Sequence, residues 1–441
     1  MASCDLAEIH AILDAHPGGI VAFDCDGTLW SGDVGDDWFD QLTLHEGLSE
    51  VAHAAVCALA QAHGVATDGD AGALGARLIA AAHAGEFPED ALYSMMAWAA
   101  AGRDLAACEA IAERTFARFG LAERVLDETK QVLDAARARG CALVAVSASP
   151  KVVIACALKR LGIEVEAICA AEARWVDGVM STELVSPLPY GEQKATLLRA
   201  QARGRAVALV LGDSAFDGAM MLLAAQGLMV RPKPALRAFA QANVGESAPI
   251  RELAAVHHEH EQVLDFWFGP AWRKGRAAHD PRWFVRSEAY DEAVRDTLLG
   301  LHIRAREGAL SAWRERPDAC VALVILLDQV PRNVFRGKAE SFATDALALA
   351  TARHAVSQGF DKAIAWLPRS FFYLPYMHCE SLSVQHESVA HYTALTDIAG
   401  KESQLSYALS HRESIAKFGR FPGRNEALGR ESTPAERDAM G

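Results

Sequence analysis

The sequence predicts two domains of different class: an α/β domain with a doubly wound parallel sheet, followed by an all-α domain. In the first half, three short apolar runs have the length and composition of buried strands, and each ends in polar residues. Helical patterns lie between these runs, which is typical of a parallel sheet. In the second half the apolar residues recur at helical spacing, without strand alternation.

The first apolar run, Gly19–Ala22, leads into the segment Phe23-Asp24-Cys25-Asp26-Gly27-Thr28-Leu29-Trp30. Asp24 and Asp26 therefore follow a strand, at the edge where open parallel sheets bind ligands. A carboxylate can attack a phosphate when a cation screens their repulsion, and a second carboxylate two residues on can transfer protons. Because Asp and Gly are also common in strand-ending turns, a strand followed by a polar turn is the alternative.

The second apolar run, Cys141–Val146, ends in Ser147-Ala148-Ser149-Pro150. Hydroxyl and amide groups at a helix start can hold phosphate oxygens, so Ser147 is a candidate ligand of a phosphoryl group. Further on, Gly191-Glu192-Gln193-Lys194 opens a helical pattern. This leaves Lys194 near the helix start, as a point charge for an anion.

The third apolar run, Ala206–Leu211, ends in Gly212-Asp213-Ser214-Ala215-Phe216-Asp217. Asp213 and Asp217 therefore lie at the same sheet edge as the first aspartate pair. Carboxylate oxygens are the ligands that Mg²⁺ prefers. The three runs together predict a phosphoryl-transfer site that holds Mg²⁺.

In this order, the four segments resemble the four motifs of the haloacid dehalogenase (HAD) superfamily, most closely its phosphoserine-phosphatase-like branch. The resemblance implies that Asp24 is the nucleophile that becomes an aspartyl-phosphate. It implies that Asp26 protonates the leaving alcohol and later activates water, and that Ser147 and Lys194 bind phosphoryl oxygens. The amide of Ala148 belongs to the same phosphate-binding segment.

The resemblance also implies the metal site and the reaction type. Asp24, the backbone carbonyl of Asp26 and Asp213 hold Mg²⁺ by this resemblance, and Asp217 adjusts that shell or Lys194. The second aspartate favours a phosphatase, because the related ion-pumping ATPases carry threonine there. Phosphomutases also keep both aspartates, so a phosphotransferase or mutase remains an alternative, as does a non-catalytic scaffold.

Between the first two motifs the sequence is mostly helical, which predicts a helical cap over about 35–121 and a core formed by 1–34 and 122–245. The expected helices are Val51–Ala60, Ala71–Ala82, Pro88–Ala101 and Leu105–Phe119.

The segment after the first motif bears on the substrate. In phosphoserine phosphatases an acidic residue here contacts the substrate's amino group, and Asp33 corresponds to it by position. With Trp38 it suits a cationic group, either a primary amine or a quaternary ammonium. The alternative is a solvated loop and helix start. The sequence assigns no carboxylate-binding role to the cap arginines Arg77, Arg103 and Arg114.

Composition limits the remaining functions. The chain has 441 residues, which exceeds the usual size of one core, and 51% hydrophobic with 23% charged residues is typical of globular proteins. A net charge of −14 argues against nucleic-acid and anionic-membrane binding. Nine scattered cysteines, the lack of a secretory signal and the lack of a membrane span predict a cytoplasmic protein with reduced thiols.

A polar stretch predicts a linker over 246–262 between the first domain, 1–245, and the second, 263–441. The cluster His257–His260 lies in this stretch. Consecutive histidines point around a helix and no second ligand set is near, so we expect a solvated segment and no metal site.

The second domain is expected to consist of packed helices. They are Ser287–Ala305, Pro317–Val330, Thr344–Ser357, Ser383–Leu395 and Ser403–Phe418. The phrases Leu326–Gly337, Phe371–Ser381 and Phe418–Asn425 resemble a bacterial family of unassigned activity, the domain of unknown function 924. That resemblance implies a tetratricopeptide-like helical fold, which can act on a metabolite or bind a protein partner.

Several basic side chains of this domain lie beside aromatic residues in expected loops and can form a pocket for phosphate or carboxylate. They are Arg332, Arg336, Arg369, Arg420 and Arg424, with His378 and His411 as further candidates. The alternative is that the arginines form ion pairs that join helix ends.

Overall fold

The computed structural model describes residues 3–185, 187–243, 250–400 and 404–440. It divides into two compact units. The first comprises Met1–Phe116 and Arg124–Val256, and the second comprises Ala117–Glu123 and His257–Gly441. The domain boundary expected between 245 and 246 lies outside the described residues. Within them, no helix has both the length and the apolar character needed to cross a membrane.

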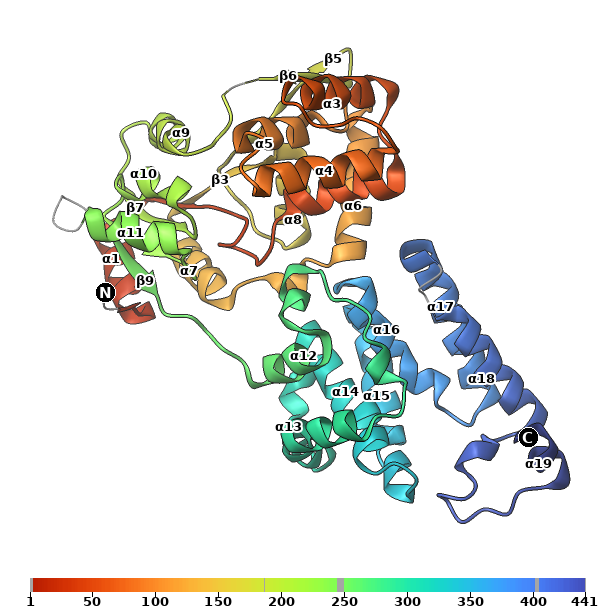
Figure 1. Cartoon of the computed structure of the whole chain (residues 1–441). Coiled ribbons are helices and arrows are strands. Elements are labelled where there is room, and N and C mark those ends of the chain that lie inside the picture. The colour runs from red at the N-terminus through yellow and green to blue at the C-terminus, as the bar shows by residue number, and fades with distance from the viewer. Residues whose placement is uncertain (1–2, 186, 244–249, 401–403, 441) are drawn as a thin grey trace. The chain divides into compact units, whose positions relative to one another are not determined.

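The first unit contains a seven-stranded parallel sheet in the order β1-β9-β8-β7-β2-β3-β4 (Figure 1). Its strands are β1 (Ser3–Cys4), β2 (Ile20–Phe23), β3 (Ala142–Pro150), β4 (Ala167–Ala171), β7 (Val207–Gly212), β8 (Gln226–Met229) and β9 (Ile250–Leu253). The sheet confirms the predicted α/β class, and all three expected strands are present. β2 is fully buried, as an apolar strand in the middle of a parallel sheet should be.

The strand order creates a switch point beside β2. The chain runs from β2 to β3 and β4 on one side, then returns to β7, β8 and β9 on the other. Phe23, the last residue of β2, is opposite Ala145 of β3 and Leu211 of β7. Ligands of open parallel sheets bind in the crevice at such a point, beyond the strand ends.

Helices cover the sheet. They are α1 (Leu6–Ala15), α7 (Asp127–Ala138), α8 (Lys151–Arg160), α9 (Glu192–Ala202), α10 (Gly218–Met221) and α11 (Pro234–Ala242). Ile20 and Ala22 of β2 share one buried apolar cluster with residues of α9, α10 and α11. α1 and α7 contact each other and the sheet.

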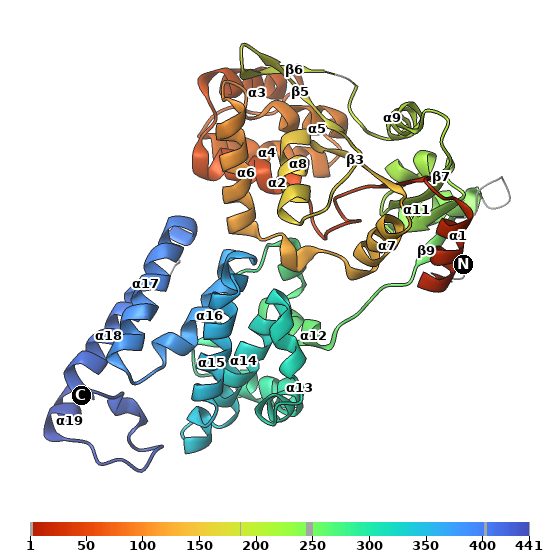
Figure 2. The ribbon, with the colours of Figure 1, turned by 180° about the vertical axis from the view of Figure 1, so that it is seen from behind.

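A helical insertion lies between β2 and β3. It contains α2 (Val34–Asp40), a π-helical turn (Gln41–Glu46), α3 (Glu50–Ala62), α4 (Ala71–His83), α5 (Glu89–Trp98) and α6 (Leu105–Phe119). The four expected helices correspond to α3 to α6. These helices lie together with the hairpin of β5 (Ala173–Val176) and β6 (Val179–Leu184), as both views show (Figure 1, Figure 2).

The second unit is built from helices, which confirms its predicted class. They are α12 (Glu259–Phe268), α13 (Glu288–Arg306), α14 (Pro317–Val334), α15 (Asp345–Ser357), α16 (Trp366–Met377), α17 (Leu382–Ala399), α18 (Leu405–Phe418) and α19 (Pro434–Met440). Ser403, the expected start of one helix, lies outside the described residues. α14 is buried along most of its length and packs against α12, α13, α15 and α16.

The predicted linker over 246–262 differs from the structure. Ile250–Leu253 form β9, which pairs with β1 and β8, and α12 already begins at Glu259. His260 is not solvated: it is buried, and its Nε2 lies 2.9 Å from Asp318 Oδ2. A buried carboxylate partner makes this histidine part of the helical core.

Candidate active site

Asp24 is the first residue after β2 and lines a cavity of about 70 Å³. Its backbone N–H donates to the carbonyl of Leu211 at 3.0 Å, so the pairing of β2 with β7 fixes its position. Only 7% of its side chain is exposed. Lys194 Nζ lies 2.8 Å from Oδ1, whereas the only hydrogen bond to Oδ2 from the described residues is that of the Thr28 hydroxyl, at 3.5 Å. One carboxylate oxygen is therefore neutralised and the other is weakly held.

Lys194 bridges two carboxylates. α9 begins after Gly191, whose φ of +55° makes the sharp turn that brings Lys194 into the first helical turn. Its Nζ lies 2.6 Å from Asp217 Oδ1 and 2.8 Å from Asp24 Oδ1. Burial disfavours the ammonium, but the charges of Asp217 and Asp24 outweigh it and raise the pKa of Lys194. Lys194 is therefore a fixed positive charge.

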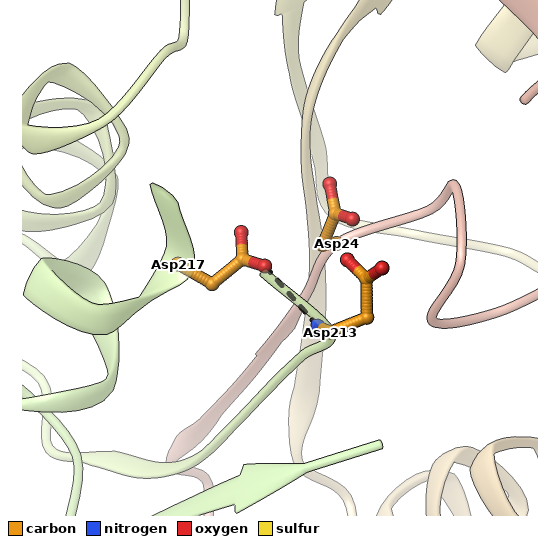
Figure 3. Close-up of side chains that lie close together, drawn as sticks. All are labelled: Asp24, Asp213 and Asp217. Carbon is orange, nitrogen blue, oxygen red and sulfur yellow. Dashed lines mark hydrogen bonds between the residues drawn. The ribbon is translucent and has the colours of Figure 1, made fainter. Parts of the chain in front are cut away.

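Asp213 and Asp217 follow β7 and complete an acidic triad with Asp24 (Figure 3). One carboxylate oxygen from each of the three lies within 4.8 Å of the others. Asp217 Oδ2 accepts hydrogen bonds from the backbone N–H of Asp213 at 3.2 Å, drawn in Figure 3, and from that of Ser214 at 3.0 Å. Lys233 Nζ lies 2.8 Å from Asp213 Oδ2.

This triad fits Mg²⁺. All donors are carboxylate oxygens, which hard divalent cations prefer. Burial, together with the neighbouring carboxylates, raises the pKa of Asp24 and Asp213, and Lys194 and Lys233 only partly oppose it. A cation would stabilise the ionised forms. The loop after β2 also lies very close to Asp213. A Cβ added at Gly27, whose φ is +77°, would be 2.3 Å from Asp213 Oδ2.

Asp26 is held from two sides. Its Oδ1 accepts hydrogen bonds from Trp30 Nε1 and from the backbone N–H of Val34, both at 2.8 Å. Its Oδ2 accepts from the hydroxyl of Ser149 at 2.7 Å and from that of Ser147 at 3.4 Å. Ser149 is thus the closer serine, and the backbone N–H of Ser149 donates to Ser147 Oγ at 3.1 Å. The sequence pattern predicts Ser147 as the candidate ligand, and the structure adds Ser149 of the same segment.

Most of the predicted residues meet at one cavity. Those that line it are Asp24, Asp26, Asp33, Ser147, Ala148, Lys194 and Asp213. Asp217 is fully buried behind them, in contact with Lys194. Trp38 does not belong to the lining: it is fully buried within α2, so the structure does not support the predicted substrate contact.

Other lining residues were not predicted. They are Tyr93, Ser149, Tyr190, Ser214, Phe216 and Lys233. For Lys233 a signal existed, because it follows the apolar run of β8 just as the acidic residues follow β2 and β7. No such sequence signal marks Tyr93 and Tyr190, because they reach the cavity from α5 and from the loop before α9.

Cys25, between the two aspartates of the first motif, is fully buried. Burial, with Asp24 and Asp26 nearby, raises the pKa of its thiol well above the ordinary value. It is a packing residue.

The seven basic candidates of the second unit do not form one pocket. Arg336 pairs with Asp291 at 2.7 Å, and Arg420 pairs with Glu436 at 2.6 Å. Arg369 lies inside α16, not in a loop, and donates to the carbonyl of Ile364 at 3.0 Å.

Four of the seven do gather, around two acidic residues of α14 and α15. Arg332, which lies inside α14, and Arg424 each pair with Asp345, at 2.9 and 3.0 Å. His378 Nδ1 lies 2.9 Å from Asp328 Oδ1. The ring of His411 is centred 6.2 Å from that of His378. The alternative expectation, ion pairs that join helix ends, describes this cluster.

Two families match the chain. Residues 21–222 match the haloacid dehalogenase-like hydrolases, and residues 263–441 match the bacterial proteins of unknown function called DUF924. The chain therefore joins a HAD-like hydrolase domain to a DUF924 domain. No curated protein matches it.

Several solved structures are similar. A protein of unknown function from Agrobacterium tumefaciens is 37% identical and covers 41% of this chain and 96% of its own, with a TM-score of 0.36. One of unknown function from Bordetella pertussis Tohama I is 19% identical and covers 53% and 97%, with a TM-score of 0.42. A probable phosphoserine phosphatase from Vibrio cholerae is 16% identical and covers 54% and 61%, with a TM-score of 0.36.

Proposed function

We propose that the first unit is a Mg²⁺-dependent phosphomonoesterase that hydrolyses a small phosphorylated metabolite through an aspartyl-phosphate on Asp24. The observation that carries this proposal is the setting of Asp24 in the cavity. Lys194 Nζ lies 2.8 Å from it, and oxygens of Asp213 and Asp217 lie within 4.8 Å. A carboxylate can attack an anionic phosphate only where positive charge is fixed beside it.

In the first step an oxygen of Asp24 forms a bond to phosphorus, and the bond from phosphorus to the ester oxygen breaks. The carboxyl group of Asp26 gives its proton to the leaving oxygen. Asp26 suits this role because it lines the same cavity, and Trp30 and Ser149 hold its two oxygens at 2.8 and 2.7 Å.

In the second step water attacks the phosphorus of the aspartyl-phosphate, and Asp26 takes the proton of that water. The bond from phosphorus to the Asp24 oxygen breaks, which releases phosphate and restores both side chains. One residue therefore serves as acid and then as base.

Positive charge and donors hold the phosphoryl group. Lys194, the Ser147 hydroxyl and the Ala148 backbone N–H are the groups of the cavity lining that can bind its oxygens. Asp24, Asp213 and the backbone carbonyl of Asp26 would hold Mg²⁺, and Asp217, the third member of the acidic triad, would adjust that shell and keeps Lys194 in place. Bound there, Mg²⁺ supplies positive charge that offsets the charge of the phosphoryl oxygens.

The test is phosphate release from a library of phosphorylated metabolites in the presence of Mg²⁺. Asp24→Asn should lower kcat by ~10³-fold or more, because the amide cannot act as nucleophile. Asp134→Asn, a change of the same kind on an exposed face of α7, is the matched control. Release that is unaffected by Asp24→Asn refutes the assigned nucleophile.

A further inference from the structure

Some residues of the cavity do not bind the phosphoryl group. Their charges indicate which other groups the substrate has. This inference rests on the proposed phosphatase function. Among the described residues that line the cavity, the charged ones are Asp24, Asp26, Asp33 and Asp213 with Lys194 and Lys233. Both lysines already contact carboxylates, at 2.8 Å or less. No arginine is found among the described residues of this lining.

Three arginines of the helical insertion are engaged elsewhere. Arg103 donates to the carbonyl of Gly47 at 2.6 Å, and Arg114 makes two hydrogen bonds to Glu46, at 2.6 and 3.0 Å. Arg77 donates to the carbonyl of Ala66 at 2.9 Å. A substrate carboxylate would therefore enter a cavity with no unengaged cation, beside four acidic groups, which is unfavourable.

Asp33, by contrast, can bind a positively charged group of the substrate. Its Oδ1 caps α2 and accepts hydrogen bonds from the backbone N–H groups of Gly35 at 2.7 Å and Asp36 at 3.1 Å. Its Oδ2 makes no hydrogen bond within the described part of the chain. The cap fixes the side chain at the cavity, so Oδ2 can receive a positively charged donor.

Three aromatic rings, those of Tyr93, Tyr190 and Phe216, line the same cavity as Asp33 and form an aromatic wall. The ring centres of Tyr93 and Tyr190 lie 5.9 Å apart, and those of Tyr190 and Phe216 lie 4.2 Å apart. Tyr190 donates its hydroxyl to Glu89 at 2.6 Å, which fixes this ring. Phe216 is 37% exposed, which places this wall toward the mouth of the cavity. Aromatic faces attract ammonium groups, including methylated ones.

We propose that the substrate carries a positively charged ammonium group and no carboxylate, as the phosphate esters of amino alcohols do. Asp33 binds the ammonium, and Tyr93, Tyr190 and Phe216 enclose it. The acidic residue corresponds to the one implied by the phosphoserine-phosphatase resemblance, but the lack of an unengaged cation separates this cavity from one built for phosphoserine.

The test uses the full-length chain with Mg²⁺ and four substrates: phosphoethanolamine, phosphocholine, phosphoserine and glycerol phosphate. We expect kcat/KM for at least one of the first two to exceed that for both others by about tenfold or more. The ratio of the first two separates a primary amine from a quaternary ammonium. Equal or faster hydrolysis of phosphoserine or glycerol phosphate overturns the inference.

A variant links the preference to Asp33. Asp33→Asn keeps an oxygen for the helix cap and removes the charge, so the preference for ammonium esters over glycerol phosphate should fall by about tenfold or more. Asp36→Asn, on the same helix but outside the lining, should keep the preference. An unchanged preference in Asp33→Asn overturns the assignment.

Two further measurements keep the inference testable. If Asp33→Asn does not fold, Tyr93→Leu should raise KM for phosphocholine more than KM for glycerol phosphate, and equal changes count against the aromatic wall. The chromogenic ester p-nitrophenyl phosphate separates the two proposals. Its hydrolysis without any ammonium preference overturns only this inference, whereas no release from any ester overturns the phosphatase function and this inference with it.

Discussion

Lys194 Nζ lies 2.6 Å from Asp217 Oδ1, and the two side chains are only 4% and 0% exposed. The same nitrogen contacts Asp24, so one ammonium links the residue after β2 to a residue after β7. A buried charge is stable in this way only while its partners are present.

Replacing this lysine should therefore weaken the fold as well as the chemistry. Lys194→Met leaves two buried carboxylates without their shared cation, and we expect a loss of ~3–5 kcal/mol in the free energy of unfolding. Urea denaturation measures it. Lys130→Met, which removes an exposed pair with Asp134, is the control and should cost less than ~1 kcal/mol. Similar losses in both variants would contradict the buried linkage.

Mg²⁺ should stabilise the folded chain through the acidic triad. A ligand that binds only the folded state at a hundred times its Kd adds about 2.7 kcal/mol of stability, so Tm should rise with Mg²⁺. Asp213→Asn removes one of the three carboxylates and should abolish most of the rise. Thermal unfolding with Mg²⁺, and with KCl at equal ionic strength, measures the rise in Tm for the wild type and for Asp213→Asn. If the rise survives in Asp213→Asn, the cation binds elsewhere.

Gly27→Ala should impair the site through geometry. The new Cβ would lie 2.3 Å from Asp213 Oδ2, at a φ of +77° that L side chains rarely adopt. Displacing Asp213 should lower kcat by about tenfold or more. Gly204→Ala is the matched control, because its φ is +84° and nothing lies within 4 Å of the added atom. Activity should then differ between the two variants even where their loss of stability is alike.

Acid should destabilise the helical unit. Burial, reinforced by Arg332, lowers the pKa of His378 to about 4, below its ordinary value of about 6.5. Between these values the unfolded chain binds a proton that folded His378 does not. The free energy of unfolding therefore falls as pH drops from about 6.5 to about 4. The lowered pKa of Asp328 adds to this loss only below its own ordinary value of about 3.9.

Thermal unfolding at pH 7.5 and pH 5 checks this expectation. His378→Asn keeps a donor for Asp328 and removes the titrating group, so its Tm should depend less on pH than that of the wild type. His302, His391 and His411, whose pKa values burial also lowers, keep the remaining dependence. An identical pH dependence in wild type and variant would show that His378 does not contribute.

The sequence was informative where one segment alone determines the structure. β2, β3 and β7 contain buried apolar runs, and the candidate site residues follow these runs directly, so both could be predicted. β9 could not, because Arg251 and Glu252 make it polar and only its pairing with β1 and β8 defines it. The aromatic wall also depends on tertiary contacts, since its members come from three separate elements.

The loop expected around Arg369 is instead part of the helix α16. Pro368 and Pro375 suggest a loop, yet Pro368 is the third residue of the helix, where the missing N–H costs nothing. Pro375 lies near the other end, two residues before Met377. The buried apolar side chains around them supply the stabilisation that the local pattern lacks.

The burial of Cys25 has a practical consequence. Alkylating reagents act on thiolates, and this sulfur is neither accessible nor ionised at neutral pH. Among the nine cysteines, all of which lie in described segments, only Cys57 and Cys379 are partly exposed. A fluorescent maleimide added to the native protein should therefore label these two positions, one in each unit, and leave the thiol between Asp24 and Asp26 untouched.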